Sequence, residues 1–128
     1  MTPFWTDDVP GMTLVREISK MSDSDGDEER LHHYIRGVCS TYFMKESMEW
    51  AKANGGVTGE NVKKGMYARK NWVPKGLEGV CLAATWTPED HRGINQVNIY
   101  KGNFNGGDVR VEKVNQVTLE RRVDWLGY

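Results

Sequence analysis

Three histidines and a cluster of acids are the residues of this chain whose types could do chemistry. Glu29 and His33 are four residues apart, a spacing that lets two side chains of one helix chelate a metal ion. Two ligands make only half of a site, and no other pair of His or Cys residues supplies the rest. No GxSxG, Walker-type, GxGxxG or HExxH motif is present. The sequence therefore predicts no catalytic residue, no metal site and no cofactor, and we expect the protein not to be an enzyme.

An aromatic ring with a polar tip occurs where an acidic loop is expected to become a helix. Tyr34 occupies that place with His33 beside it, and Trp5 belongs to an aromatic segment near the start of the chain. Rings of this kind suit the recognition of a small molecule at the rim of a cavity. The alternative is that Tyr34 covers the core, His33 is solvated and Trp5 is buried. The spacing alone favours this alternative.

Residues 22–29, with the sequence SDSDGDEE, invite comparison with a calcium loop. An EF-hand loop needs acids at positions 1, 3 and 5, Gly at position 6 and Glu at position 12. With Gly26 at position 6, position 1 is Met21, and with Asp23 at position 1, position 12 is Tyr34. Neither alignment supplies the ligands, so the sequence predicts a solvated acidic loop that leads into a helix.

Cys39 and Cys81 are the two cysteines of the chain. They cannot form a Cys₄ zinc site. They could form a disulfide if the protein is exported, or remain two buried thiols if it is not. Both interpretations stay open at the level of sequence.

Composition limits the class of protein. The chain has 128 residues with a net charge of −1, which fits one soluble domain or a piece of one. A balance this close to neutral excludes a general binder of nucleic acid, because phosphate backbones select clustered Lys and Arg. No apolar run approaches the roughly 20 residues of a membrane-spanning helix. Residues 1–11 have neither a basic region nor an apolar region, so we expect no signal peptide here.

Apolar periodicity predicts two short helices. Asp7 and Asp8 precede Pro10, a favourable start for a helix over residues 10–21. Thr58 can cap a helix over residues 59–69. The inward residues expected are Leu14, Val15, Ile18 and Met21 in the first helix, and Val62, Met66 and Tyr67 in the second.

A longer helix is predicted over residues 28–53. Glu28 and Glu29 would lie at its positive N-terminal end, and the Gly pair after Asn54 would end it. Its apolar face is so wide that other structure must pack on both sides. We expect self-association that buries Ile35, Tyr42, Phe43 or Met44 between chains. The face consists of Ile35, Val38, Cys39, Tyr42 and Phe43, widened by Met44, Met48 and Ala51.

The last third of the chain has the composition of strands and turns. We predict a strand over residues 79–87, a turn over 88–93, and a hairpin with strands over 97–101 and 109–114. The aromatic tail, 123–128, is expected to pack against the rest of the protein.

In order along the chain, these segments resemble a known family. The most specific piece is TPEDHRG at 87–93, and VTGENV at 57–62 is the second; HHYIRGVCSTYFMKESMEWA at 32–51 and WLGY at 125–128 fit the same order. From about residue 2 to its end, the chain resembles the C-terminal third of the branched-chain amino-acid type (type I) of periplasmic substrate-binding protein. These receptors deliver small molecules to ABC importers.

The resemblance implies an α/β fold with two lobes joined by three crossovers, which captures an amino acid or a related molecule without turnover. Residues 1–128 would supply about three helices and three to five strands and contribute to both lobes, with 97–101 at the last crossover. Tyr34 matches a position that faces the ligand cleft, with His33 beside it and Trp5 nearby. The implied location is periplasmic or extracytoplasmic, and the implied partners are the ligand and the permease.

The chain also departs from the family, because the N-terminal two-thirds of the fold is absent. We therefore expect a fragment that cannot close a cleft and that exposes surfaces suited to self-association. A sensing or regulatory receptor of the same fold would look identical over these residues. A third interpretation, an unrelated small α+β enzyme, would require a pair of acid and base groups with perturbed pKa values converging in a pocket.

Overall fold

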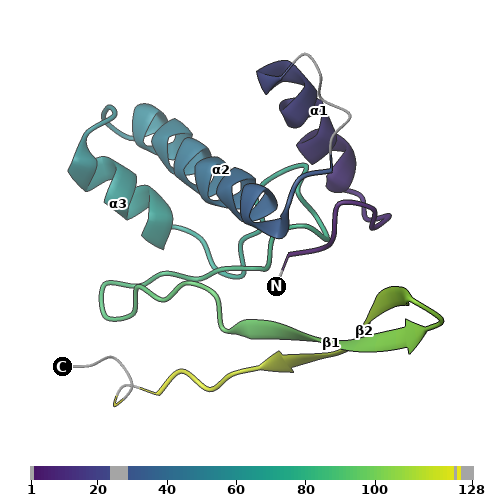
Figure 1. Cartoon of the computed structure of the whole chain (residues 1–128). Coiled ribbons are helices and arrows are strands. Elements are labelled where there is room, and N and C mark those ends of the chain that lie inside the picture. Colours follow the sequence, from purple (N-terminus) through teal and green to yellow (C-terminus); the bar gives the residue numbers. More distant parts are fainter. Residues whose placement is uncertain (1, 24–28, 123, 125–128) are drawn as a thin grey trace.

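A computed structural model of the chain describes residues 2–23, 29–122 and 124. The helices lie above a two-stranded hairpin, and irregular segments of residues 68–95 run between them (Figure 1). The protein is thus a small α/β structure with the three helices that the sequence predicts. Two strands stand in the described residues in place of the three to five expected. The elements are α1 (Met12–Ser22), α2 (His32–Ala53), α3 (Gly59–Tyr67), β1 (Gln96–Asn105) and β2 (Asp108–Thr118).

Helix α1 confirms the first predicted helix with a shift of its start from 10 to 12. Met12 and Val15 are fully buried in the core, and Leu14 and Ile18 pack against it. Met21 is 87 % exposed, so the prediction that it faces inward is wrong. It lies in the last turn of α1, next to the end of the helix, where no other element covers it.

Helix α2 begins four residues later than predicted and ends at Ala53 as predicted. Glu29 precedes the helix, so its expected place at the N-terminal end of the helix dipole is wrong. The Arg30 side chain explains the late start, because it donates to Ser19 Oγ at 3.1 Å and to Asp23 Oδ2 at 2.8 Å. These bonds hold the segment before α2 against the end of α1. The acidic residues 24–28 lie outside the described residues.

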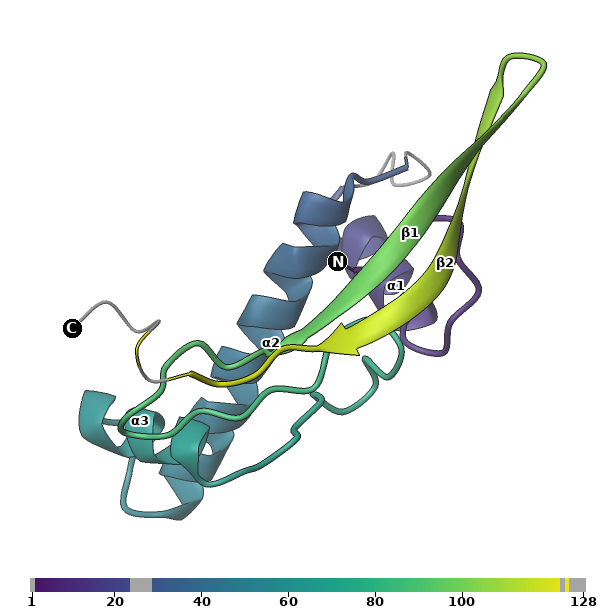
Figure 2. The ribbon, with the colours of Figure 1, turned by 90° about the horizontal axis from the view of Figure 1, so that it is seen from below.

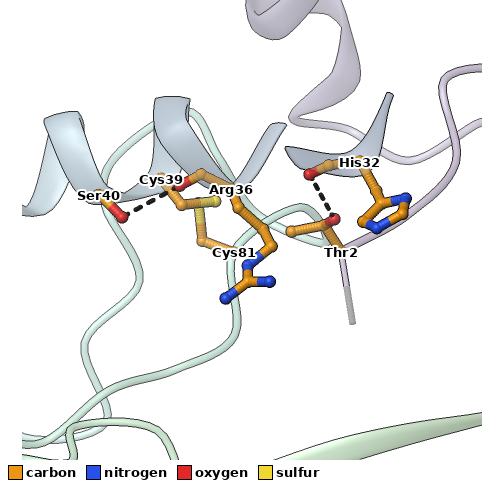
Figure 3. Close-up of a disulfide and its surroundings, with 6 residues drawn as sticks. All are labelled: Thr2, His32, Arg36, Cys39, Ser40 and Cys81. Carbon is orange, nitrogen blue, oxygen red and sulfur yellow. Dashed lines mark hydrogen bonds between the residues drawn. A yellow bond between two sulfur atoms is a disulfide. The ribbon is translucent and has the colours of Figure 1, made fainter. Parts of the chain in front are cut away.

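A disulfide between Cys39 and Cys81 joins α2 to the irregular segment, which decides the question that the sequence left open. The two Cα atoms are 5.7 Å apart, and both side chains belong to the buried core (Figure 3). Ile35 and Phe43 are buried in the same core. The expectation that these two residues are covered by a second chain is therefore wrong. Tyr42 is partly buried, and Met44 is 47 % exposed.

Helix α3 packs on α2 with its N-terminus capped as predicted. Thr58 Oγ1 accepts a hydrogen bond from the Asn61 N–H at 3.2 Å. Gly65 faces Ser47 so closely that a Cβ atom there would lie 2.7 Å from the Ser47 carbonyl oxygen. Close contact of the two backbones therefore places α3 along the second half of α2.

The predicted strand over residues 79–87 is wrong. Single bridges pair Ala84 with Trp72 and Thr85 with Gly93, and the chain between 77 and 81 forms turns. Leu77 and Val80 are nevertheless almost completely buried. An apolar run in a turn-rich segment can fill a core without pairing as a strand, and here the disulfide fixes it to α2.

The hairpin is confirmed, with longer strands than predicted. Val97 pairs with Val117 and Phe104 with Val109, so the strands continue through residues 102–105, which the sequence assigned to the turn. The turn is Gly106–Gly107, both with positive φ (58° and 105°), as two-residue hairpin turns require. The turn end projects beyond the helices (Figure 2). The predicted packing of the tail falls on residues that, apart from residue 124, lie outside the described residues.

Candidate functional site

The structure brings together two of the three residues that the sequence singles out. Tyr34 lies in the first turn of α2 and Trp5 in the segment before α1, with their ring centroids 6.4 Å apart in a T-shaped arrangement. Both rings are partly buried against the core. The Arg30 guanidinium lies 5.9 Å from the centroid of the Tyr34 ring. Trp5 and Arg30 thus both lie against the Tyr34 ring.

Tyr34 also lines a small cavity of about 300 Å³ between α1 and α2. Ile18 forms the α1 side, and Tyr42 lies two turns along α2 from Tyr34. The volume is at the low end of the range typical of small-molecule sites, about 300–1,000 Å³. The Tyr34 side chain and a cavity of that size are therefore adjacent.

His33 is exposed and does not line this cavity. Its ring contacts that of His32, with centroids 4.2 Å apart. Over the described ranges 2–23, 29–122 and 124, no three His, Cys, Asp or Glu side chains are grouped so that they could hold a metal ion. Glu29 and His33 therefore gain no further ligand within that part of the chain.

A second and larger cavity, of about 760 Å³, lies between α2 and the segment that leads into β1. It has no lining residue in common with the set Tyr34, His33 and Trp5. The disulfide forms part of its wall, and Arg36 extends from α2 past the disulfide (Figure 3). The lining residues are Thr2, His32, Arg36, Cys39, Ser40, Phe43, Met44, Met66, Cys81, Leu82, Trp86, Ile94, Gln96, Val97 and Asn98.

The sequence analysis missed this cavity because its residues belong to no motif and come from both halves of the chain. One signal was present. His32, Arg36 and Ser40 recur every four residues, which places them on one face of a helix beside the apolar stripe. The segment that closes the cavity from the other side is irregular, and periodicity carries no information about such a segment.

The TPEDHRG turn at 87–93 is organised by one carboxylate. Asp90 accepts hydrogen bonds from the Arg92 N–H and guanidinium and from Arg121, which follows β2. These bonds, Arg92 foremost, hold the pKa of the Asp90 carboxyl well below its usual value of 3.8. Arg121 also donates to the Gly93 carbonyl. The turn thereby ties the segment after the hairpin to the segment before it.

Two aromatic contacts fix this turn against the helices. Trp86 covers Gly93, whose φ is 72°, and a Cβ atom on that glycine would lie 2.5 Å from the indole ring. The Tyr67 hydroxyl at the end of α3 is 2.6 Å from His91 Nε2, and the two rings stack. The most distinctive sequence motif of the chain is therefore a structural joint between α3 and the hairpin.

Glu46 in α2 is a further important residue, and its carboxylate is the centre of a hydrogen-bond network. Its carboxylate accepts from the Arg69 guanidinium at 2.6 Å, the Trp72 indole N–H at 2.8 Å and the Lys75 N–H at 2.7 Å. The three donors anchor the start of the irregular segment to α2. No local pattern marks Glu46, because all of its partners lie more than twenty residues away.

In comparisons with known proteins, no family model matches the chain, and neither a curated protein nor a solved structure matches it. None of the helices in the described residues is both long enough and apolar enough to cross a membrane.

Proposed function

We propose that the chain is the C-terminal portion of a type I, branched-chain amino-acid type periplasmic substrate-binding protein. Its function would be to help capture an amino acid or a related small molecule for an ABC-type importer, by binding without turnover. The proposal starts from the order and spacing of the segments at 32–51, 57–62 and 87–93. Their resemblance to that family is the reason for choosing it over other small α/β proteins.

The hairpin is the structural observation that most supports this proposal. It has two strands, no further strand pairs with it among the described residues, and its apolar side chains are open to solvent. An isolated two-stranded hairpin is marginally stable at best and needs further strands or a packed face. In a two-lobed receptor, the strands and helices of the rest of the fold would cover this surface. The exposed large apolar residues of β1 and β2 are Val97, Ile99, Phe104, Val109, Val111 and Val114.

The disulfide supports an extracytoplasmic location. Disulfides persist in oxidising compartments such as the periplasm and are rare in the reducing cytosol. Cys39 and Cys81 are 42 positions apart and are both buried in the core. Their pairing is therefore part of the folded state, as expected for an exported protein.

Within this proposal, Tyr34 and Trp5 contribute to the ligand cleft of the full-length receptor. Tyr34 lines the small cavity between α1 and α2, and Trp5 packs against its ring in a T-shaped arrangement. No hydrogen bond engages the Tyr34 hydroxyl within the described part of the chain, so this group can bond a ligand. His33 beside it is exposed and can contact a ligand from the rim.

The test is to join the chain to the sequence encoded upstream of it and to titrate that receptor with the common amino acids by calorimetry. We expect the joined receptor to bind one of them and Tyr34→Ala to weaken that binding by about 1–3 kcal/mol. The melting temperature of the ligand-free variant should change little. Tyr34→Phe separates the hydroxyl from the ring.

The chain by itself serves as the matched control. It should bind free amino acids no better than about millimolar, because half of a cleft leaves the charged groups of the ligand unpaired. A Tyr34→Ala receptor that melts earlier but keeps its affinity would show that Tyr34 is a core residue. A joined receptor that binds no small molecule would reject the proposed function.

A further inference from the structure

The larger cavity has a polar end and an apolar end along α2. His32, Arg36 and Ser40 follow one another at intervals of one helical turn on its wall, and Phe43 and Met44 come next. Because residues four apart share a helix face, the polar side chains line the part near the start of α2. The apolar side chains line the part that approaches α3, where Met66, Trp86 and Ile94 complete the wall.

One charged side chain lines the polar end. Among the described residues that line this cavity, Arg36 is the single Lys, Arg, Asp or Glu, so they supply a cationic anchor and no carboxylate. No ion pair or hydrogen bond engages its guanidinium within the described residues. Figure 3 shows the side chain extending away from α2 and past the disulfide. An Arg in this position can bind a carboxylate through two parallel hydrogen bonds.

We propose that this cavity binds an apolar monocarboxylate, with its carboxylate on Arg36 and its hydrocarbon body against the disulfide, Phe43 and Trp86. Arg36 and Met44 are eight positions apart, which is about 12 Å along the helix and suits a medium-length hydrocarbon chain. The volume of about 760 Å³ lies well inside the range of small-molecule sites. The inference does not rest on the proposed function, because the cavity shares no residue with the Tyr34 site.

The wall chemistry also predicts what the cavity rejects. A zwitterionic amino acid would bring an ammonium group to a wall whose described residues include no carboxylate to pair with it, and burying an unpaired charge is costly. An alcohol of the same length would not provide the carboxylate that pairs with the Arg36 guanidinium. Selectivity for a carboxylate over both relatives is therefore the signature of this site.

The experiment uses the whole chain and three probes with the same eight-carbon skeleton: octanoate, octan-1-ol and 2-aminooctanoate. We expect calorimetry to show octanoate binding at least about tenfold more tightly than either relative, as for a charge-assisted pair. Amide NMR shifts on adding octanoate should be largest at residues 36–44 and 94–98. Equal affinity for 2-aminooctanoate, or shifts centred on the hairpin tip near Phe104, would overturn the proposal.

Two matched variants locate the anchor. Arg36→Gln removes the charge from an exposed side chain and should weaken octanoate binding about tenfold. Lys52→Gln makes the same charge change on the same helix, outside the cavity, and should leave the affinity unchanged. Ile94→Trp should weaken binding by filling the apolar end. Equal affinities of the two charge variants, with unchanged melting temperatures, would reject the assignment of Arg36.

Discussion

The helical part of the protein buries a core of large apolar side chains, whereas the hairpin exposes most of its own to solvent. Met12, Ile35 and Leu77 in the helical part are 0 % exposed, whereas Phe104 and Val109 in the hairpin are 80 % and 57 % exposed. Burial of apolar area is the main favourable term in folding. Burial of apolar side chains therefore stabilises the helical part. The exposed apolar surface of the hairpin is expected to be covered by further structure of the full-length receptor or by a second chain.

Long-range connections account for the difference. The helical part is closed by Glu46 and by the disulfide, which join α2 to the start and to the middle of the irregular segment. The hairpin is attached near one end, where Leu119 N–H donates to the Asn95 carbonyl at 2.7 Å and Arg121 binds Asp90. Halfway along β1, Tyr100 contacts Phe4 with ring centroids 5.7 Å apart. Beyond that contact the strands run into solvent.

The largest effect that would test this comparison is loss of the disulfide. Cys39→Ser combined with Cys81→Ser should lower the free energy of unfolding by about 4 kcal/mol, the loop-closure value for a separation of 42 residues. Circular dichroism during urea unfolding measures the change. The control is Ser40→Ala, next to Cys39 on the exposed side of α2, which should unfold like the parent. Equal urea midpoints for the oxidised parent and the double variant would show that the stability of the helical part does not depend on the disulfide.

A smaller effect on thermal stability is expected at the turn over residues 87–93, which joins the helical part to the hairpin. The folded-state pKa of Asp90 is lowered, so its ion pairs stabilise the protein above the ordinary value of 3.8 and lose that effect as the pH falls below it. Asp90→Asn should therefore melt earlier than the parent at about pH 7, and the gap should narrow as the pH falls below 3.8.

The control for this prediction is Asp8→Asn, an exposed carboxylate in the segment before α1, which should follow the parent at every pH. Thermal melts monitored by tryptophan fluorescence give the comparison. A gap between Asp90→Asn and the parent that stays constant down to the lowest pH would show that the charge of Asp90 does not hold the joint.

The smallest effect on stability is expected in the hairpin. Phe104→Ser removes a side chain that is 80 % exposed, so the free energy of unfolding should change by less than about 0.5 kcal/mol. Ile35→Ala, in the core, should cost about 2–5 kcal/mol. Light scattering should show that Phe104→Ser lowers self-association while Ser40→Ala does not. A parent that is monomeric at all concentrations would contradict the expectation that the exposed apolar residues of the hairpin cause self-association.

Helices and the hairpin were predictable because their signals are local. Apolar periodicity marks α1 and α2, Thr58 marks the cap of α3, and the glycine-rich stretch between residues 101 and 109 marks a hairpin turn, which the structure narrows to Gly106–Gly107. The strand predicted at 79–87 is wrong because the local signal there does not distinguish a strand from a turn. An apolar run satisfies a buried strand and a buried turn equally well, and the choice depended on Cys81 reaching α2.

The candidate site shows the same division between features set by local sequence and features set by long-range contacts. The sequence alone determined that Tyr34 lies near the start of the long helix, although the contacts of Arg30 with the end of α1 set the boundary itself. Tertiary structure decided that Trp5 packs against Tyr34, that His33 faces solvent, and that Arg36 lines a cavity with residues from both halves of the chain. These facts depend on how segments far apart in the sequence pack together, and local periodicity contains no information about such packing.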